Sequence, residues 1–188
     1  MGRWEPNAQG RLGTAAMELY AERGFDQTTV ADIAERAGLT KRTFFRHYAD
    51  KRDVLFAGAV VLRELVMRAI VEAPADLSPA AAVTLGLEAG GAMMEQRPEQ
   101  VKLRQSIINA HVELQERELV KLAALAGDVA AALQERGLDR WQAHLVAEAG
   151  MAAFRVAFAR WLAESAETSF PQVIRETMEQ LATSVTLA

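Results

Sequence analysis

The stretch TTVADIAERAGLTKRTFFRHY, residues 28–48, contains two short helical patterns separated by a glycine turn. The first pattern begins at Thr28 or Thr29, either of which can cap a helix. If Thr29 is the cap, Asp32 follows three residues later as in a capping box. Gly38 can end this helix in the left-handed conformation, and Thr40 can cap the second one. Two short helices joined in this way predict a helix-turn-helix motif.

The second helix of this motif has one apolar face and one basic face. A rotation of about 100° per residue puts Phe44 and Tyr48 on one face, where they can join a core. The opposite face carries Arg42 and Arg46, with Phe45 on its flank. The solvent side is therefore basic and holds an aromatic ring that the core does not need. Such a helix fits the major groove of DNA, where its first residues meet base edges.

The side chains of the second helix suggest distinct contacts. Arg42 can donate a bidentate pair of hydrogen bonds to guanine, and Thr43 and Phe45 can contact thymine methyl groups. Phosphate contacts, which fix register without reading sequence, are expected from Lys41, Arg46 and Lys51. The alternative is that this cluster is only a solvated charged face, but the turn, the caps and the outward ring together favour nucleic-acid binding.

Composition supports an ordinary globular protein with one local anionic partner. The 188 residues are 51% hydrophobic and 24% charged, and they include no cysteine, which excludes disulfides and thiolate metal sites. The net charge is −4, yet five lysines and arginines fall within residues 40–52. The sequence shows neither a signal peptide nor an apolar run long enough for a membrane span, so we expect a cytoplasmic protein.

Helical periodicity continues over almost the whole sequence and predicts an all-α fold of about nine helices. The expected helices cover about 11–23, 29–37, 40–48, 51–72, 79–95, 98–110, 112–136, 139–164 and 171–186. We expect residues 1–50 to form a helix-turn-helix DNA-binding domain and residues 51–188 to form a larger helical domain.

The block from Arg11 to Leu55 resembles the N-terminal domain of TetR-family transcriptional regulators. The segments that carry the resemblance are Arg23-Gly24-Phe25, Thr28-Thr29-Val30, Asp32-Ile33-Ala34, Ala37-Gly38-Leu39-Thr40 and Thr43-Phe44-Phe45-Arg46-His47-Tyr48, with Lys51. The resemblance implies a homodimer that binds a palindromic operator and responds to a small molecule, most often as a repressor. It also implies that residues 51–188 serve ligand binding and dimerisation. By position it implies DNA contacts at Thr29, Thr40, Lys41, Arg42, Thr43, Phe45, His47 and Lys51, to which we add Thr28 and Arg46.

Two positions depart from the family pattern. The family commonly has tyrosine where this chain has Phe45, so a phenolic phosphate contact is not expected here. It often has a small residue at the place of Arg42, so side-chain base reading is expected to be stronger in this chain.

The helix over 139–164 places large apolar residues and small residues at helical spacing, namely Met151, Phe154, Phe158 and Leu162 with Ala149, Gly150, Ala153 and Ala157. Its second half resembles the family's penultimate helix, which forms a four-helix dimer interface with the last helix, here 171–186. The alternative is that these residues are core positions. Dimer formation also has a physical advantage. A protein that binds two DNA half-sites at once gains affinity without needing a new type of contact.

Signals for a ligand pocket are weaker. Gly90 and Gly91 lack side chains and could leave a cavity beside adaptable methionines. The candidate ligand-binding residues are Met93, Met94, Gln105, Asn109, His111, Phe154 and Phe158. Each polar residue among them, like His144 and Arg155, also suits a core hydrogen bond or the surface. The expected effector is an apolar or amphipathic small molecule.

Enzyme chemistry finds no support in the sequence. It contains no GxSxG, HExxH, Walker loop or dinucleotide-binding glycine pattern, and its three histidines lack metal-ligand spacing. We therefore expect no enzyme, no cofactor and no metal. The competing hypothesis is a helical adaptor, or a small-molecule-binding protein, that does not bind DNA.

Overall fold

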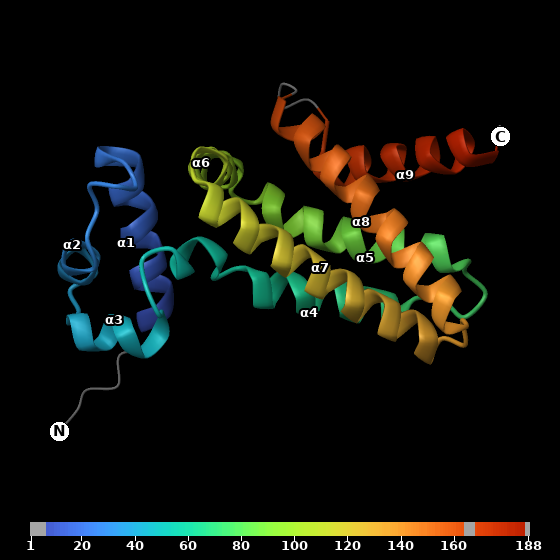
Figure 1. Ribbon diagram of the computed structural model, residues 1–188, viewed down its shortest axis with the longest axis horizontal. Helices are drawn as coiled ribbons and strands as arrows, with labels where there is room; N and C mark the ends of the chain where they lie inside the picture. Colours follow the sequence, from blue (N-terminus) through green and yellow to red (C-terminus); the bar gives the residue numbers. More distant parts are fainter. Residues whose placement is uncertain (1–6, 164–167, 187–188) are drawn as a thin grey trace. The chain divides into compact units, whose positions relative to one another are not determined.

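The computed structural model describes residues 7–163 and 168–186, which form nine α-helices, one short 3-10 helix and no strand (Figure 1). The helices are α1 (Ala8–Arg23), α2 (Val30–Arg36), α3 (Lys41–His47), η1 (Asp53–Phe56), α4 (Ala59–Glu72), α5 (Pro79–Glu95), α6 (Pro98–Ala110), α7 (Val112–Glu135), α8 (Arg140–Ala163) and α9 (Phe170–Thr186). The predicted all-α class is confirmed. Among the described residues, every helix is too short or too polar to span a lipid bilayer.

The prediction of one continuous helix over 51–72 is wrong, because η1 and α4 are separate elements. Hydrogen bonds between residues three apart, such as Ala57 N to Val54 O at 3.2 Å, make η1 a 3-10 turn. Its three apolar residues, Val54, Leu55 and Phe56, are all buried. Because a 3-10 helix turns by about 120° per residue, these three side chains point in three different directions, and unit 1 covers all of them.

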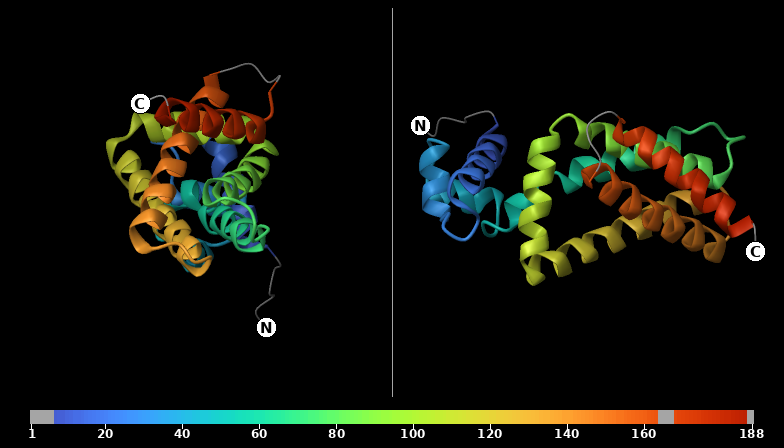
Figure 2. Two further views of the ribbon diagram at one scale, coloured as in Figure 1. Left: turned by 90° about the vertical axis from the view of Figure 1, so that its right-hand side faces the viewer. Right: turned by 90° about the horizontal axis from the view of Figure 1, so that it is seen from above.

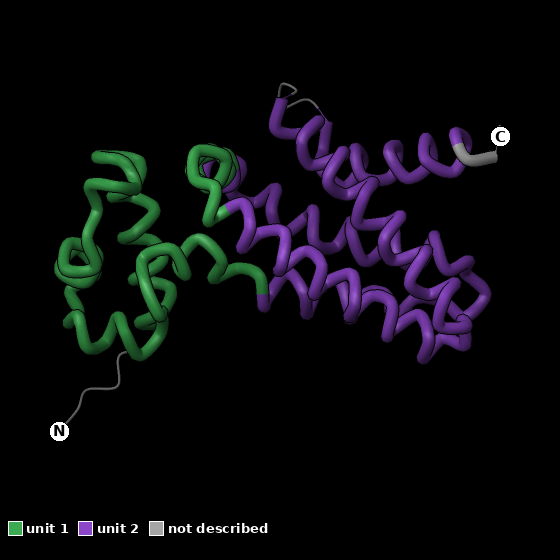
Figure 3. The backbone as a smooth tube through the Cα atoms, in the orientation of Figure 1, with its two compact units in different colours: residues 1–59, 102–114 green, residues 60–101, 115–188 purple. Residues whose placement is uncertain are grey.

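The chain divides into two compact units, shown in different colours in Figure 3. The described part of unit 1 comprises residues 7–59 and 102–114, and that of unit 2 comprises 60–101 with 115–163 and 168–186. Unit 1 therefore joins the helix-turn-helix to the corner between α6 and α7. The functional boundary expected after residue 50 stays a prediction, whereas the packing unit extends past it.

Unit 1 has a core of its own, built on α1. Leu12 and Leu19 of α1 and Phe44 of α3 are fully buried, and Ile108 of α6 belongs to the same cluster. Full burial of a side chain of this size stabilises the fold by about 1.5–3 kcal/mol. The motif is therefore held by one shared core rather than by its turn alone.

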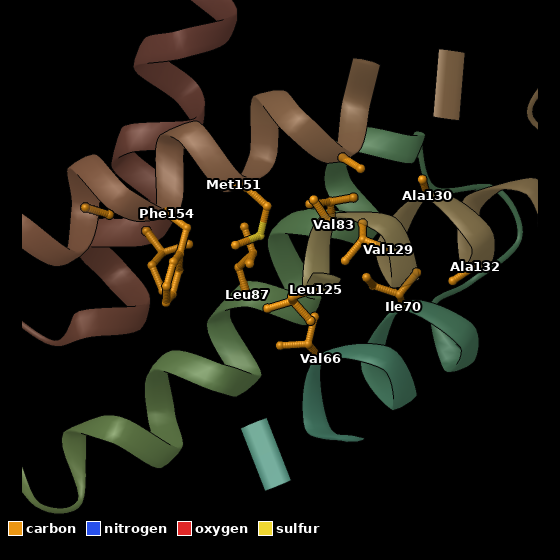
Figure 4. Packing of buried hydrophobic residues seen from close by; sticks show 14 of the residues in the cluster. Val66, Ile70, Val83, Leu87, Leu125, Val129, Ala130, Ala132, Met151 and Phe154 are labelled. Carbon is orange, nitrogen blue, oxygen red and sulfur yellow. The ribbon is translucent and has the colours of Figure 1, made fainter. Parts of the chain in front are cut away.

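Unit 2 is a helical bundle whose core comes from five helices, α4, α5, α7, α8 and α9 (Figure 4). Helices α5, α8 and α9 lie side by side, as both views of Figure 2 show. Met151 and Phe154 of α8 are buried in this core, so the core alternative holds for these two residues.

Glycines of α5 allow close helix packing and do not leave a cavity. A Cβ atom at Gly91 would lie 2.7 Å from Cδ1 of Ile174 in α9, and one at Gly90 would lie 2.7 Å from Cδ1 of Leu62. Neighbouring side chains thus fill the space that the glycines provide, and the expectation of a cavity at this point is wrong.

Candidate nucleic-acid interface

The start of α2 is fixed by a reciprocal capping box. The hydroxyl oxygen of Thr29 accepts a hydrogen bond from the backbone N–H of Asp32 at 3.2 Å. In return, the Asp32 carboxylate accepts from the Thr29 N–H at 2.9 Å, and this bond lowers the pKa of Asp32. The predicted box is confirmed, and it satisfies two N–H groups that the helix itself leaves without partners.

A glycine turn sets the direction of α3. Gly38 has a φ of 64°, which disfavours any residue with a side chain. The N–H of Leu39 donates to the Ala34 carbonyl at 2.8 Å, and the guanidinium of Arg11 donates to the Ala37 carbonyl. Thr40 then caps α3 by accepting from the Thr43 N–H at 3.1 Å. The turn is therefore held both from within and from α1.

Burial agrees with the predicted division of α3 into two faces. Phe44 is 0% exposed and Tyr48 4%, and the Tyr48 hydroxyl donates to the Gln9 carbonyl at 3.1 Å. Phe45 is 57% exposed, and its ring lies edge-on to Phe44 with centroids 5.5 Å apart. The buried ring thus supports an aromatic side chain that remains accessible to a partner.

Basic side chains flank this exposed ring. Arg42 and Arg46 are exposed, and together with Thr43 and Phe45 they line an open depression on unit 1. The hydroxyl groups of Thr40 and Thr43 lie 3.0 Å apart, which ties the Thr43 side chain to the cap. Guanidinium donors beside an aromatic face and a threonine form a surface that can meet base edges and phosphates.

Of the ten predicted DNA contacts, six are exposed: Thr29, Thr40, Lys41, Arg42, Phe45 and Arg46. Thr43, His47 and Lys51 are partly buried, and Thr28 is buried. None of these ten assignments is tested by the fold itself, so all of them stay predictions. The structure does show that Thr28, Lys51 and His47 differ from the rest.

Thr28 faces the interior of unit 1. Its side chain is 0% exposed, and its hydroxyl donates to the Gly24 carbonyl at 2.8 Å. Thr29, and not Thr28, occupies the capping position of α2. The Thr28 hydroxyl is therefore available to bond the backbone at the end of α1. In this conformation the Thr28 side chain does not reach the surface.

Lys51 is engaged inside unit 1. Its ammonium group donates to the carbonyls of Phe25, Asp26 and Thr28 at 2.8, 3.1 and 3.0 Å. The same group lies 4.6 Å from the centroid of the Phe25 ring. These bonds account for all three hydrogens of the ammonium group, so a phosphate contact would have to replace one of them.

His47 is partly buried at the end of α3. Its Nε2 is enclosed and has no hydrogen-bond partner among the described residues. An enclosed polar atom without a partner costs about 1–3 kcal/mol. This nitrogen does not face solvent in the present conformation.

The predicted ligand residues are not gathered in one unit. Gln105, Asn109 and His111 belong to unit 1, and the amide of Gln105 donates to Asn109 at 3.0 Å. The members in unit 2 are Met93, Met94, Phe154 and Phe158. The last two stack with centroids 6.2 Å apart, next to Trp161 and Phe170, whose rings stack at 4.7 Å. Helical spacing singles out Phe154 and Phe158 in the sequence, but no signal there connects them to Trp161 or to Phe170 of the next helix.

Metal ligation has no candidate in the described part of the chain. No group of three or more histidine, aspartate or glutamate side chains there could hold a metal ion.

Comparison with known proteins places the resemblance in unit 1. The pattern of the family "Bacterial regulatory proteins, tetR family" matches residues 13–57. The HTH-type transcriptional regulator TcmR of Streptomyces glaucescens is 36% identical over 69 residues, which are 37% of this chain and 30% of TcmR. The chain thus matches less than a third of the length of this relative.

Solved structures extend the likeness to the whole fold. Thermus thermophilus FadR, a TetR-family transcriptional repressor in complex with lauroyl-CoA, is similar with a TM-score of 0.61 over 93% of both chains, at 21% identity. A complex of SmeT with triclosan is similar with a TM-score of 0.68 over 94% of this chain and 90% of SmeT, at 14% identity. At these identities the likeness concerns the fold alone.

Proposed function

Because the N-terminal domain of this chain belongs to the TetR family of bacterial regulatory proteins, we propose that the protein is a transcriptional regulator that binds operator DNA. The observation that carries this proposal is the exposed face of α3. Arg42 and Arg46 lie there beside Phe45, which is 57% exposed, while Phe44 behind them is fully buried. A helix anchored on one side and cationic on the other suits the major groove.

Base reading is assigned to the first turn of α3. Arg42 donates two hydrogen bonds to a guanine, and Thr43 and Phe45 contact thymine methyl groups. Lys41 and Arg46 neutralise phosphates on either side, which fixes the register of the helix in the groove. Because Phe45 has no hydroxyl, it contributes apolar contact only. Arg42 is the residue expected to discriminate between bases.

We further propose a homodimer formed through α8 and α9. Trp141, Leu145 and Val156 of α8 are 75%, 71% and 60% exposed. At 100° per residue they fall within an arc of about 60°, so they form one apolar stripe along the solvent face of this helix. Large apolar side chains gathered in this way mark a protein interface, and a second copy of the chain would cover the stripe.

A dimer fits a palindromic operator, since its two recognition helices would meet half-sites about one helical turn, or 34–36 Å, apart. We propose that the protein represses transcription from this site in the cytoplasm. It acts on DNA through binding alone and not as an enzyme.

The proposed effector is an apolar or amphipathic small molecule bound by unit 2. Support comes from relatives of the same fold, which are described in complex with lauroyl-CoA and with triclosan. The bundle of unit 2 has an aromatic cluster around Phe154 and Phe170 that such a molecule could contact. An effector releases the operator only if it binds more tightly to the conformation that does not fit DNA.

Selection from random DNA duplexes tests the proposal. The full chain is expected to enrich an inverted repeat that contains a guanine in each half-site. The variant Arg42→Ala, compared in the same selection, should enrich the same repeat with a relaxed preference at the base pair that Arg42 contacts. Enrichment of no sequence, combined with no binding at low salt, would instead favour a helical adaptor that binds no DNA.

A further inference from the structure

His111 joins two segments of unit 1 that are far apart in the sequence. It lies at the corner between α6 and α7, and its Nδ1 is 2.8 Å from the carbonyl oxygen of Ile107. Its Nε2 is 3.2 Å from a carboxylate oxygen of Asp26, in the loop between α1 and α2. The ring also packs edge-on against Phe25, with centroids 5.0 Å apart. The corner is thus connected to the loop that leads into α2.

The chemistry of the two acceptors selects one protonation state of the ring. A carbonyl oxygen and a carboxylate only accept hydrogen bonds, so both ring nitrogens of His111 must carry a hydrogen to complete both contacts. This form is the imidazolium cation. In the neutral ring with hydrogen on Nδ1, a lone pair of Nε2 would face the Asp26 carboxylate, and the contact would be repulsive.

The charged groups near the ring lie on the α1–α2 loop, on α7 and at residues 51–52. Asp26 faces it from the α1–α2 loop, and Glu113 faces it from the first turn of α7. Two cations lie nearby: Arg52 is 3.8 Å from Glu113, and Lys51 donates to the Asp26 carbonyl. The Ile107 carbonyl raises the pKa of His111 most, the two carboxylates add to this, and burial opposes it.

We propose that His111 and Asp26 form a proton-dependent latch that fastens the α6–α7 corner to the loop preceding α2. Asp26 lies three residues before Thr29, the cap of α2, so the latch acts on the segment that positions the helix-turn-helix. Helices α6 and α7 both continue from this corner into unit 2 (Figure 3). A change at the corner therefore acts on both helices. Only the effect on DNA binding rests on the proposed function; the latch itself does not.

The direction of the pH effect follows from the raised pKa. The latch contributes its full stability below the ordinary histidine value of 6.5. It is lost as the pH rises through the higher value of the folded protein. Alkaline conditions should therefore loosen the corner, and mildly acidic conditions should fasten it.

Titration of the three histidines by NMR in the full-length protein tests the latch directly. Asp26→Asn keeps an acceptor oxygen but removes the charge, and it should lower the pKa of His111 by roughly 0.5–1, the size of an accessible ion pair at this distance. His144→Gln serves as the matched control. An unchanged His111 titration in Asp26→Asn would overturn the latch.

Hydrogen exchange provides a second measurement that does not require DNA. After correction for intrinsic exchange, opening of residues 24–29 should increase about three- to ten-fold between acidic and alkaline pH in the parent protein. It should become independent of pH in His111→Gln and remain pH-dependent in His144→Gln. The same opening profile in all three proteins would also overturn the latch.

Affinity for the selected operator duplex, measured at the same pH values, separates the two proposals. If the parent protein binds DNA but His111→Gln leaves the pH profile of affinity unchanged, the latch does not control DNA binding. If the parent protein binds no duplex, the proposed function fails, and the titration still decides whether the latch exists.

Discussion

Replacing Lys51 by methionine separates a positioning role from a phosphate contact. Methionine keeps most of the apolar stem but donates no hydrogen bond. The change removes donors to three carbonyls, of which those of Phe25 and Thr28 are the more buried, and a cation 4.6 Å from the Phe25 ring. At about 1 kcal/mol for each of the two partly buried bonds and about 0.5–1 for the ring contact, we expect a loss of about 3 kcal/mol in unfolding free energy.

Two measurements check this expectation. Urea denaturation gives the loss of stability, and DNA affinity over a range of salt concentrations gives the number of phosphate contacts. Lys41→Met is the matched control, because Lys41 is an exposed lysine in the first turn of α3. It should leave stability nearly unchanged and make the log–log salt slope of a dimer shallower by about 1.8, since each lost phosphate contact accounts for about 0.9.

Lys51→Met should instead weaken DNA binding with the salt slope unchanged, because the ammonium group acts on the loop and not on phosphate. A shallower slope together with unchanged stability would refute this reasoning. Lys51 would then release its carbonyl partners and contact the DNA backbone directly.

Other substitutions test further parts of the account. Arg42→Ala should cost about 1–3 kcal/mol of operator binding and relax specificity at one base pair, and an equal loss on every sequence would make Arg42 a phosphate contact. Leu145→Asp should dissociate the dimer in sedimentation experiments and keep the helical circular dichroism of the parent, whereas an unchanged dimer would move the interface away from this stripe. Gly91→Ala should destabilise unit 2 by about 1–3 kcal/mol, because its Cβ would lie 2.7 Å from Ile174, and unchanged urea denaturation would show that the packing yields easily.

Local features of the motif could be predicted from the sequence because their partners are neighbours in the chain. The box between Thr29 and Asp32 and the cap at Thr40 depend on residues three apart. The contrast between buried Phe44 and exposed Phe45 follows from helical rotation alone. Each of these features is set by residues within about one turn of helix, so the local sequence determines it.

Features that depend on distant partners could not be predicted in this way. Lys51 reads as a surface cation, yet its hydrogen-bond partners lie more than twenty positions earlier in the chain. His111 reads as a ligand residue of the larger domain, yet the structure places it in unit 1 against Asp26. No spacing in the sequence predicts that Arg11 donates to the Ala37 carbonyl of the motif, or that Tyr20 donates to the Lys51 carbonyl that follows it.

The most direct test of the central proposal is the affinity of the full chain for duplex DNA from its own upstream region at several salt concentrations. If α3 enters the major groove in both copies of a dimer, Lys41 and Arg46 supply about four phosphate contacts, and the log–log slope should be about −3.6 or steeper. Absence of binding at about 50 mM salt, or an affinity that does not depend on salt, would contradict the account.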